Sequence, residues 1–252
     1  MKNTIAMLTL IFLLSACGPS PVGGTTVTCR SLLDSLSALT GGLEVPGYFR
    51  TINPVKTGGE FDVMQYFTIL DHLSPQPGYV LDYVYHYDEL GGFPVLYVRT
   101  VDTPPYKSEA ELTASDGLTN YMDFIQTDDT PDGYFQYVLL SLTANRFYLF
   151  WHANYSDSQV VCDKADVNRI VASLNGDFGY RISLASRIRA AFIKDIEPSI
   201  VVNEDSVEVS FVTFTRWGGF FRQSFTISRS FPHAILDEQE QNLVPYDCGV
   251  LF

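Results

Sequence analysis

One stretch decides the fold class: residues 79–87, which read YVLDYVYHY. From Tyr79 to Tyr87 every second residue is a tyrosine or a leucine, and this period of two predicts a β-strand with those side chains on one face. Gly91-Gly92 permits a tight turn and residues 93–101 return the chain, so we expect a β-hairpin here. The opposite face of the first strand carries the polar residues Asp82, His86 and Asp88.

The flanking sequence switches between helical and extended patterns. Capping residues, apolar residues at helical spacing and glycine or proline stops predict helices. The predicted helices cover residues 28–39, 62–73, 108–125, 163–174 and 183–196. Apolar runs bounded by turn residues predict further strands. These are a second hairpin, 134–142 and 146–152 with a central return strand, and a meander, 199–202, 207–215 and 220–229.

This order of elements predicts an α+β fold. We expect an antiparallel sheet built from hairpins and a C-terminal meander, with helices packed on one face. Because 46% of the residues are hydrophobic, residues 27–252 can bury a sizeable core, and we expect them to form a single domain. The tail, residues 231–252, is predicted to wrap over the surface.

The first seventeen residues predict where the protein works. Lys2 precedes an apolar run, Ile5–Leu14, that is too short to span a bilayer. The segment Leu14-Ser15-Ala16-Cys17 that closes this run resembles the lipobox of bacterial lipoproteins. The resemblance implies that residues 1–16 are a signal peptide, removed before Cys17, and that Cys17 is the lipidation site, carrying acyl chains such as palmitate.

A lipidated Cys17 would anchor the exported protein to the outer face of the cytoplasmic membrane or to the outer membrane. Residues 17–26 are rich in glycine, proline, serine and threonine, so we expect a flexible tether between the membrane and the domain. The alternative is an ordinary secreted protein that is cut after Ala16.

The charge of the chain limits the classes of partner that it can bind. The formal net charge is −13, and no run of lysine and arginine occurs in the sequence. This pattern excludes a nucleic-acid partner and predicts no polybasic lipid-binding patch.

Beyond Cys17 the chain has three further cysteines: Cys29, Cys162 and Cys248. In an oxidising compartment they predict one disulfide and one free thiol, with the pairing left open. A bond between Cys29 and Cys248 would close the largest loop. None of the three lies at ligand spacing from another cysteine or a histidine, so we expect no metal site.

The two faces of the strand at 79–87 offer candidate sites. Asp82, His86 and Asp88 could bind a divalent metal or form an acid–base pair. The preferred interpretation is the solvent face of an edge strand, because Val80 and Val84 alternate with the polar groups.

Aromatic side chains offer a second kind of site. Tyr83 and Tyr85 could stack on a sugar or grip a peptide, but the preferred interpretation is that helices cover this face and make it core. Trp217, beside a glycine turn, is predicted to be either a lid over a cleft or an exposed contact residue.

The sequence contains no standard catalytic or nucleotide-binding motif and implies no cofactor. The preferred hypothesis is therefore a lipid-anchored binding or interaction module at the cell envelope, with a protein, peptide or glycan ligand. One alternative is an extracytoplasmic hydrolase with an unfamiliar acid and histidine site. Another is an inhibitor or immunity-type lipoprotein that blocks a protein partner through an exposed apolar patch around Trp217 and Phe220.

Overall fold

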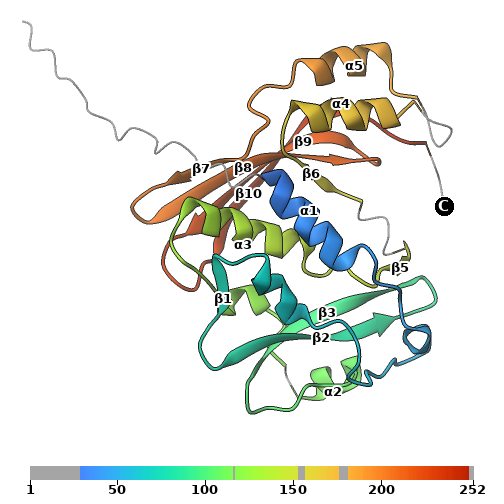
Figure 1. Ribbon diagram of the computed structural model, residues 1–252, viewed down its shortest axis with the longest axis vertical. Coiled ribbons are helices and arrows are strands. Elements are labelled where there is room, and N and C mark those ends of the chain that lie inside the picture. Colours follow the sequence, from blue (N-terminus) through green and yellow to red (C-terminus); the bar gives the residue numbers. More distant parts are fainter. Residues whose placement is uncertain (1–28, 116, 153–156, 176–180, 250–252) are drawn as a thin grey trace, which may run out of the picture.

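The computed structural model describes residues 29–115, 117–152, 157–175 and 181–249. It confirms an α+β fold with antiparallel sheets and a C-terminal meander (Figure 1). The lipobox and the tether, residues 1–26, lie outside the described residues and stay predictions.

The helices and strands have the following bounds. The α-helices are α1 Cys29–Thr40, α2 Glu109–Ala114, α3 Pro131–Thr143, α4 Lys164–Ser173 and α5 Leu184–Ala191, and the 3-10 helices are η1 Gly47–Phe49, η2 Val63–Thr68 and η3 Tyr121–Phe124. The strands are β1 Leu73–Pro75, β2 Tyr79–Tyr87, β3 Gly91–Thr100, β4 Ile125–Thr127, β5 Phe150–Trp151, β6 Gln159–Val161, β7 Ser199–Val202, β8 Ser206–Thr215, β9 Gly219–Ser228 and β10 Ile235–Pro245.

The strands of the described residues pair in three antiparallel sheets. The largest runs in the order β10-β9-β8-β6, with β7 also paired to β8, and the second runs β2-β3-β5. The smallest joins β1 to β4. The predicted hairpin is confirmed. Its register runs from Tyr79 opposite Thr100 to Tyr87 opposite Gly92.

The second predicted hairpin is wrong, because residues 131–143 form helix α3. Thr130 caps this helix by accepting a hydrogen bond from the Gly133 amide at 3.1 Å, and Pro131 lies in its first turn, where proline is tolerated. Every residue from Gly133 to Leu140 is buried. A helix that is buried all round has no polar face, so its sequence cannot be told from that of a buried strand.

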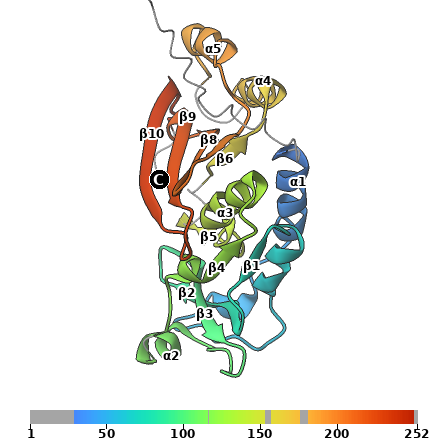
Figure 2. The ribbon, with the colours of Figure 1, turned by 90° about the vertical axis from the view of Figure 1, so that its left-hand side faces the viewer.

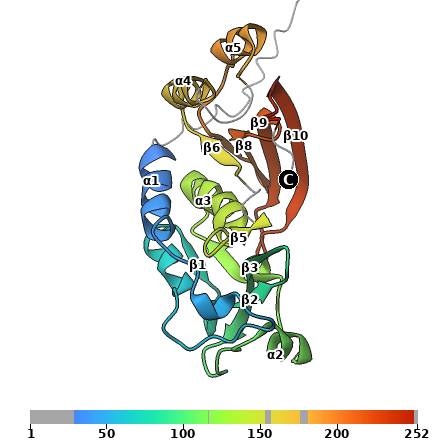
Figure 3. The same ribbon diagram turned by 90° about the vertical axis from the view of Figure 1, so that its right-hand side faces the viewer.

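Helix α3 lies in the centre of the molecule. Figures 2 and 3 show it between the β8-β9-β10 meander on one side and α1 on the other. Residues on all three elements belong to one hydrophobic cluster, which includes Leu36, Leu139 and Phe211. The return strand expected at 146–152 shrinks to β5, which pairs with Gly91 and Gly92 at the edge of β3.

The prediction of a surface wrap at the C-terminal end is also wrong. Residues 235–245 form β10, which pairs with β9 from Ile235 opposite Ile227 to Pro245 opposite Gly219. From Ile235 to Asn242 every residue is exposed, so this strand has no alternation of apolar and polar residues to detect. Its acidic side chains suit an edge strand, where charge discourages further pairing.

The predicted helices do not all begin and end where expected. The 62–73 helix is the 3-10 helix η2, although Asp62 caps it as expected. The 108–125 helix is split into α2 and η3, and Ser108 caps α2 as predicted by accepting from the Glu111 amide at 3.3 Å. Helix α5 ends early, at Ala191, and α4 ends at Ser173.

A disulfide joins Cys29 to Cys162 across 133 residues, and Cys248 is a buried free cysteine. One disulfide and one free thiol were expected, with the pairing left open. The structure pairs Cys29 with Cys162, and not with Cys248, which would have closed the largest loop. Cys248 lies instead in a hydrophobic cluster that also holds Val161 and Val244. The bond attaches the first turn of α1 to the chain just before α4.

Candidate functional site

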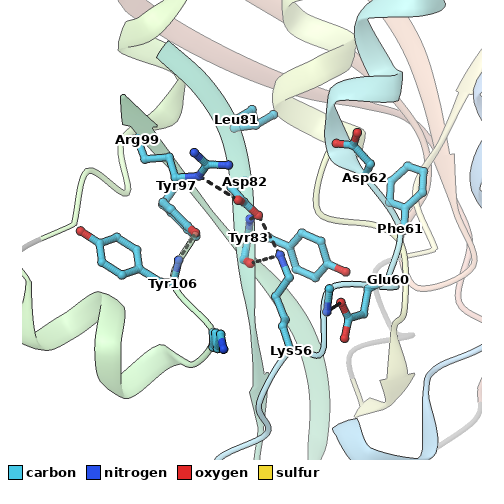
Figure 4. A network of polar contacts seen from close by, with 12 residues as sticks. Lys56, Glu60, Phe61, Asp62, Leu81, Asp82, Tyr83, Tyr97, Arg99 and Tyr106 are labelled. Atoms are coloured by element: carbon cyan, nitrogen blue, oxygen red, sulfur yellow. Dashed lines mark hydrogen bonds and ion pairs between the residues drawn. The ribbon is translucent and has the colours of Figure 1, made fainter. Parts of the chain in front are cut away.

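Asp82, the first residue of the predicted polar face, lies in a closed network of charges (Figure 4). Lys56 Nζ lies 2.7 Å from Asp82 Oδ1, and Arg99 Nε lies 3.0 Å from Oδ2. All three side chains are mostly buried: Lys56 is 12% exposed, Asp82 13% and Arg99 19%. Both carboxylate oxygens already have a cation, so Asp82 has no free oxygen for a metal or a substrate. We call these three residues the Lys56 network.

The aromatic ring of Tyr83 helps to hold Lys56. Lys56 Nζ donates to the Tyr83 carbonyl at 2.9 Å and lies 4.0 Å from the centroid of the Tyr83 ring, a cation–π distance. The loop that carries Lys56 is fastened by Glu60, which accepts from the Thr57 amide at 2.6 Å. Burial favours a raised Glu60 pKa, but hydrogen bonds from Thr57, Tyr48 and Gly58 outweigh it and lower the pKa to about 2.

His86 and Asp88, the other residues of the polar face, form a separate group. His86 Nδ1 lies 2.6 Å from Glu109 Oε2, and Nε2 lies 3.6 Å from Asp88 Oδ2. The prediction of a solvent-exposed face is wrong, because α2 packs over it. Its Leu112 forms a buried cluster with Val84 and Tyr97. In the part of the chain that the structure describes, no three acidic, histidine or cysteine side chains are grouped to hold a metal ion.

Tyr83 and Tyr85 are core residues, so neither can contact a ligand from outside. Both side chains are fully buried. Tyr85 donates to the Tyr148 carbonyl at 2.6 Å and stacks on Phe49 with ring centroids 4.3 Å apart. The groove interpretation of the tyrosine face is therefore wrong, and the core interpretation is right. Trp217 is exposed in the β8–β9 turn, where a contact role stays a prediction.

A pocket of about 380 Å³ lies elsewhere, between α1, the end of α3, β6 and α4. This volume is within the range of small-molecule sites. Its polar and charged lining residues are Arg30, Asp34, Ser37, Thr40, Tyr66, Thr143, Arg146, Ser158, Gln159, Asp166, Arg169 and Thr213. Its apolar lining residues are Leu33, Leu36, Leu142, Val160, Cys162 and Ile170.

One wall of the pocket is fixed by links between α1 and α4. The Cys29–Cys162 disulfide joins the two segments covalently. Next to it, Arg30 lies 2.8 Å from both Asp163 and Asp166, and Arg169 also pairs with Asp166. The Asp166 carboxylate accepts from the Cys162 amide at 2.9 Å as well. The two acids and two arginines of this wall therefore neutralise one another.

Arg146 on the other wall differs, because no ion pair joins it to a carboxylate among the described residues. Its backbone amide donates to the Thr143 carbonyl at 2.9 Å, which places it in the turn after α3. Within the described ranges, the guanidinium bonds only the Ser158 carbonyl. Burial lowers the pKa of Arg146, and the charge of Asp157 partly opposes this. Asp157 itself accepts from Thr215 and from the Arg216 amide.

The geometry suits recognition of an anion. A guanidinium has five donors in a planar fork that matches a carboxylate or phosphate, and one carbonyl satisfies few of them. Thr143 and Ser158 line the same pocket, beside apolar side chains such as Leu142. The pocket thus offers a positive end, hydroxyl groups and an apolar wall.

Sequence reasoning missed this pocket because its lining comes from five separate segments. Arg146 was predicted to be the first residue of the return strand of a hairpin that does not exist. The one usable signal was an arginine four residues beyond the apolar run that ends at Leu142, since an arginine in that position lies near the core if the run is a buried helix.

The chain matches no known protein family, no curated protein and no solved structure. No helix in the described part of the chain has the length and hydrophobicity needed to cross a membrane.

Proposed function

We propose that this protein is a lipid-anchored extracytoplasmic binding module of the cell envelope, and that its pocket takes a small ligand with a carboxylate or phosphate group and an apolar part. The observation that carries the proposal is the half-buried guanidinium of Arg146, which pairs with no carboxylate among the described residues.

The energetics favour a ligand for Arg146. A charge that is withdrawn from water without a counter-ion is unfavourable, so it usually either moves to solvent or gains a partner. Arg146 cannot lose its proton near neutral pH, because a guanidinium stays charged even when burial lowers its pKa. An anion in the pocket would make charge-assisted hydrogen bonds to it, the stronger class in proteins.

The two other functional hypotheses have less support. A hydrolase requires an acid or a histidine in a pocket with a second polar group from a distant segment. Asp166 is the buried acid of the pocket, and both Arg30 and Arg169 pair with it. An inhibitor was expected to present an apolar patch around Trp217 and Phe220, but Phe220 is fully buried.

Export to an oxidising compartment is supported by the Cys29–Cys162 disulfide, since such bonds persist there. The lipid anchor is tested by replacing Cys17 with serine. Cell fractionation should then find the protein released from membranes. Unchanged membrane association of Cys17→Ser would contradict the anchor.

Ligand binding is tested by thermal unfolding against a panel of small carboxylates and phosphate compounds. A ligand that binds only the folded state stabilises it by about 2.7 kcal/mol at one hundred times its dissociation constant, so the midpoint rises. We expect at least one panel member to raise the midpoint of the wild-type protein and not that of Arg146→Gln.

The matched control is Arg187→Gln, which removes an exposed arginine that does not line the pocket and should keep the shift. A panel without any shift, or a shift that survives in Arg146→Gln, would contradict the proposal.

A further inference from the structure

Helix α5 presents its large apolar side chains to solvent. Leu184, Ile188 and Phe192 are 74%, 51% and 76% exposed. They are spaced four residues apart, so they form one stripe along the helix and its last turn. The buried residue of α5 is the small Ala190, which lies on the opposite side. The helix is therefore amphipathic in the reverse sense from an ordinary surface helix, whose apolar stripe faces the core.

Basic side chains flank this stripe. With about 100° between successive residues of a helix, Arg187 and Arg189 lie on either side of Ile188. Arg181 precedes the helix and Lys194 follows it, and all four side chains are exposed. Between residues 181 and 194 the sequence has these four cations and no acid, in a chain whose net charge is −13.

The position of α5 fits a membrane-facing surface. Figure 1 shows α4 and α5 together at one end of the molecule, with the β2–β3 hairpin at the other end. Lys164 of α4 donates to the Ala190 carbonyl at the end of α5 at 2.9 Å. Cys162, two residues before Lys164, is bonded to Cys29 at the start of α1. The predicted tether therefore joins the domain near this end.

We propose that α5 docks on an anionic lipid bilayer, with its apolar stripe at the level of the headgroups and its arginines on lipid phosphates. An apolar stripe flanked by arginines is the pattern of helices that lie in a membrane interface. The charge is complementary to anionic lipids and opposite to that of the whole chain. The tether between Cys17 and Cys29 spans about 40 Å at most, which would keep α5 within reach of the membrane.

This contact is independent of the Arg146 pocket and requires no ligand there. It departs from the expectation that the chain has no polybasic lipid-binding patch. The basic residues are separated by apolar and small residues in the sequence, and the helix brings them to the two sides of one stripe.

The test is a local probe, because a lipid anchor would bind any vesicle. The full-length protein, as processed in cells, carries Ile188→Cys labelled with a polarity-sensitive fluorophore. It is mixed with vesicles of phosphatidylglycerol and phosphatidylcholine in equal parts, or of phosphatidylcholine alone. The control label is at Val101→Cys, an exposed apolar position just after β3.

We expect a blue shift of the α5 probe, and quenching by a lipid-borne quencher, with the phosphatidylglycerol vesicles only. The control label should stay in water with both vesicles. The α5 signal should be lost in Arg187→Glu/Arg189→Glu and at about 1 M salt, where electrostatic attraction is screened beyond about 3 Å. An unchanged melting midpoint of the double variant would show that it is folded.

Three results would overturn the proposal. The α5 probe could stay in water with both vesicles. It could respond equally to both, which would remove the role of lipid charge. It could respond to protein concentration without vesicles, which would mean that a second copy of the chain covers the stripe.

Discussion

The Lys56 network and the Arg146 pocket place similar cations in opposite situations. In the network, Lys56 and Arg99 share one carboxylate, and both oxygens of Asp82 are occupied at 2.7 and 3.0 Å. In the pocket, Arg146 bonds a main-chain carbonyl, and Asp157, whose charge acts on it, binds other donors. The first arrangement is complete without a ligand, whereas the second would gain from the anion that we propose for it. The partners of each cation, more than its residue type, separate the structural network from the proposed binding site.

The largest expected effect comes from removing the covalent link at the pocket wall. Cys29→Ser/Cys162→Ser should lower the free energy of unfolding by about 4–5 kcal/mol, since the bond closes a long loop. Denaturant unfolding in oxidised and reduced buffer measures this difference. The reductant should lower the stability of the wild-type protein and leave that of the double variant unchanged. If wild-type stability does not respond to reductant, the bond contributes nothing.

The next effect breaks the Lys56 network. Asp82→Ala leaves two cations mostly buried without their counter-ion, which should cost about 3 kcal/mol in unfolding free energy. The matched control is Glu89→Ala, which removes an exposed acid between β2 and β3. For this variant we expect a loss of less than about 0.5 kcal/mol in unfolding free energy. Equal losses in the two variants would mean that the network is not structural.

Arg146→Gln tests the other side of the comparison between the Lys56 network and the Arg146 pocket. Because this arginine has no ion-pair partner among the described side chains, its replacement should change the unfolding free energy by less than about 1 kcal/mol without ligand. Asp82→Ala should therefore lose stability and keep ligand binding, whereas Arg146→Gln should keep stability and lose ligand binding. A loss of several kcal/mol in Arg146→Gln would assign Arg146 a structural role.

The smallest expected effect is a pH dependence of stability that arises near the start of α3, away from the pocket at its end. His72 Nδ1 lies 2.6 Å from Asp128 Oδ2, and this hydrogen bond raises the His72 pKa, while burial lowers it to a lesser extent. The stabilisation is complete below the unfolded-state pKa of 6.5 and is lost as the pH rises through the higher folded-state pKa.

Unfolding free energies measured from about pH 6 to about pH 9 should show this loss in the wild-type protein and not in His72→Gln. We expect less than about 1 kcal/mol, because the pair is partly exposed. A loss of equal size in His72→Gln would assign the pH dependence to another group.

Elements with a clear local pattern could be predicted from the sequence. The hairpin follows from alternating tyrosines, and the helix starts at Asp62, Ser108 and Asp163 follow from capping residues that satisfy free amides. Elements without a polar–apolar contrast could not. Helix α3 is buried on all sides and β10 is exposed on both, so neither shows a period.

The candidate site was beyond sequence reasoning for a related reason. Asp82 and His86 were rightly placed on one strand face, but the cations that neutralise Asp82 come from residue 56 and from the neighbouring strand. The pocket depends on α1 and α4 meeting through a disulfide whose pairing the spacing leaves open.

The most direct test of the central claim is a calorimetric titration of the best anion from the panel into the wild-type protein and into Arg146→Gln. A hydrogen bond to a charged group contributes about 1.5–3 kcal/mol, so we predict an affinity at least about tenfold weaker in the variant. Equal affinities would show that the anion does not bind at Arg146, and would contradict the account of the pocket as its site.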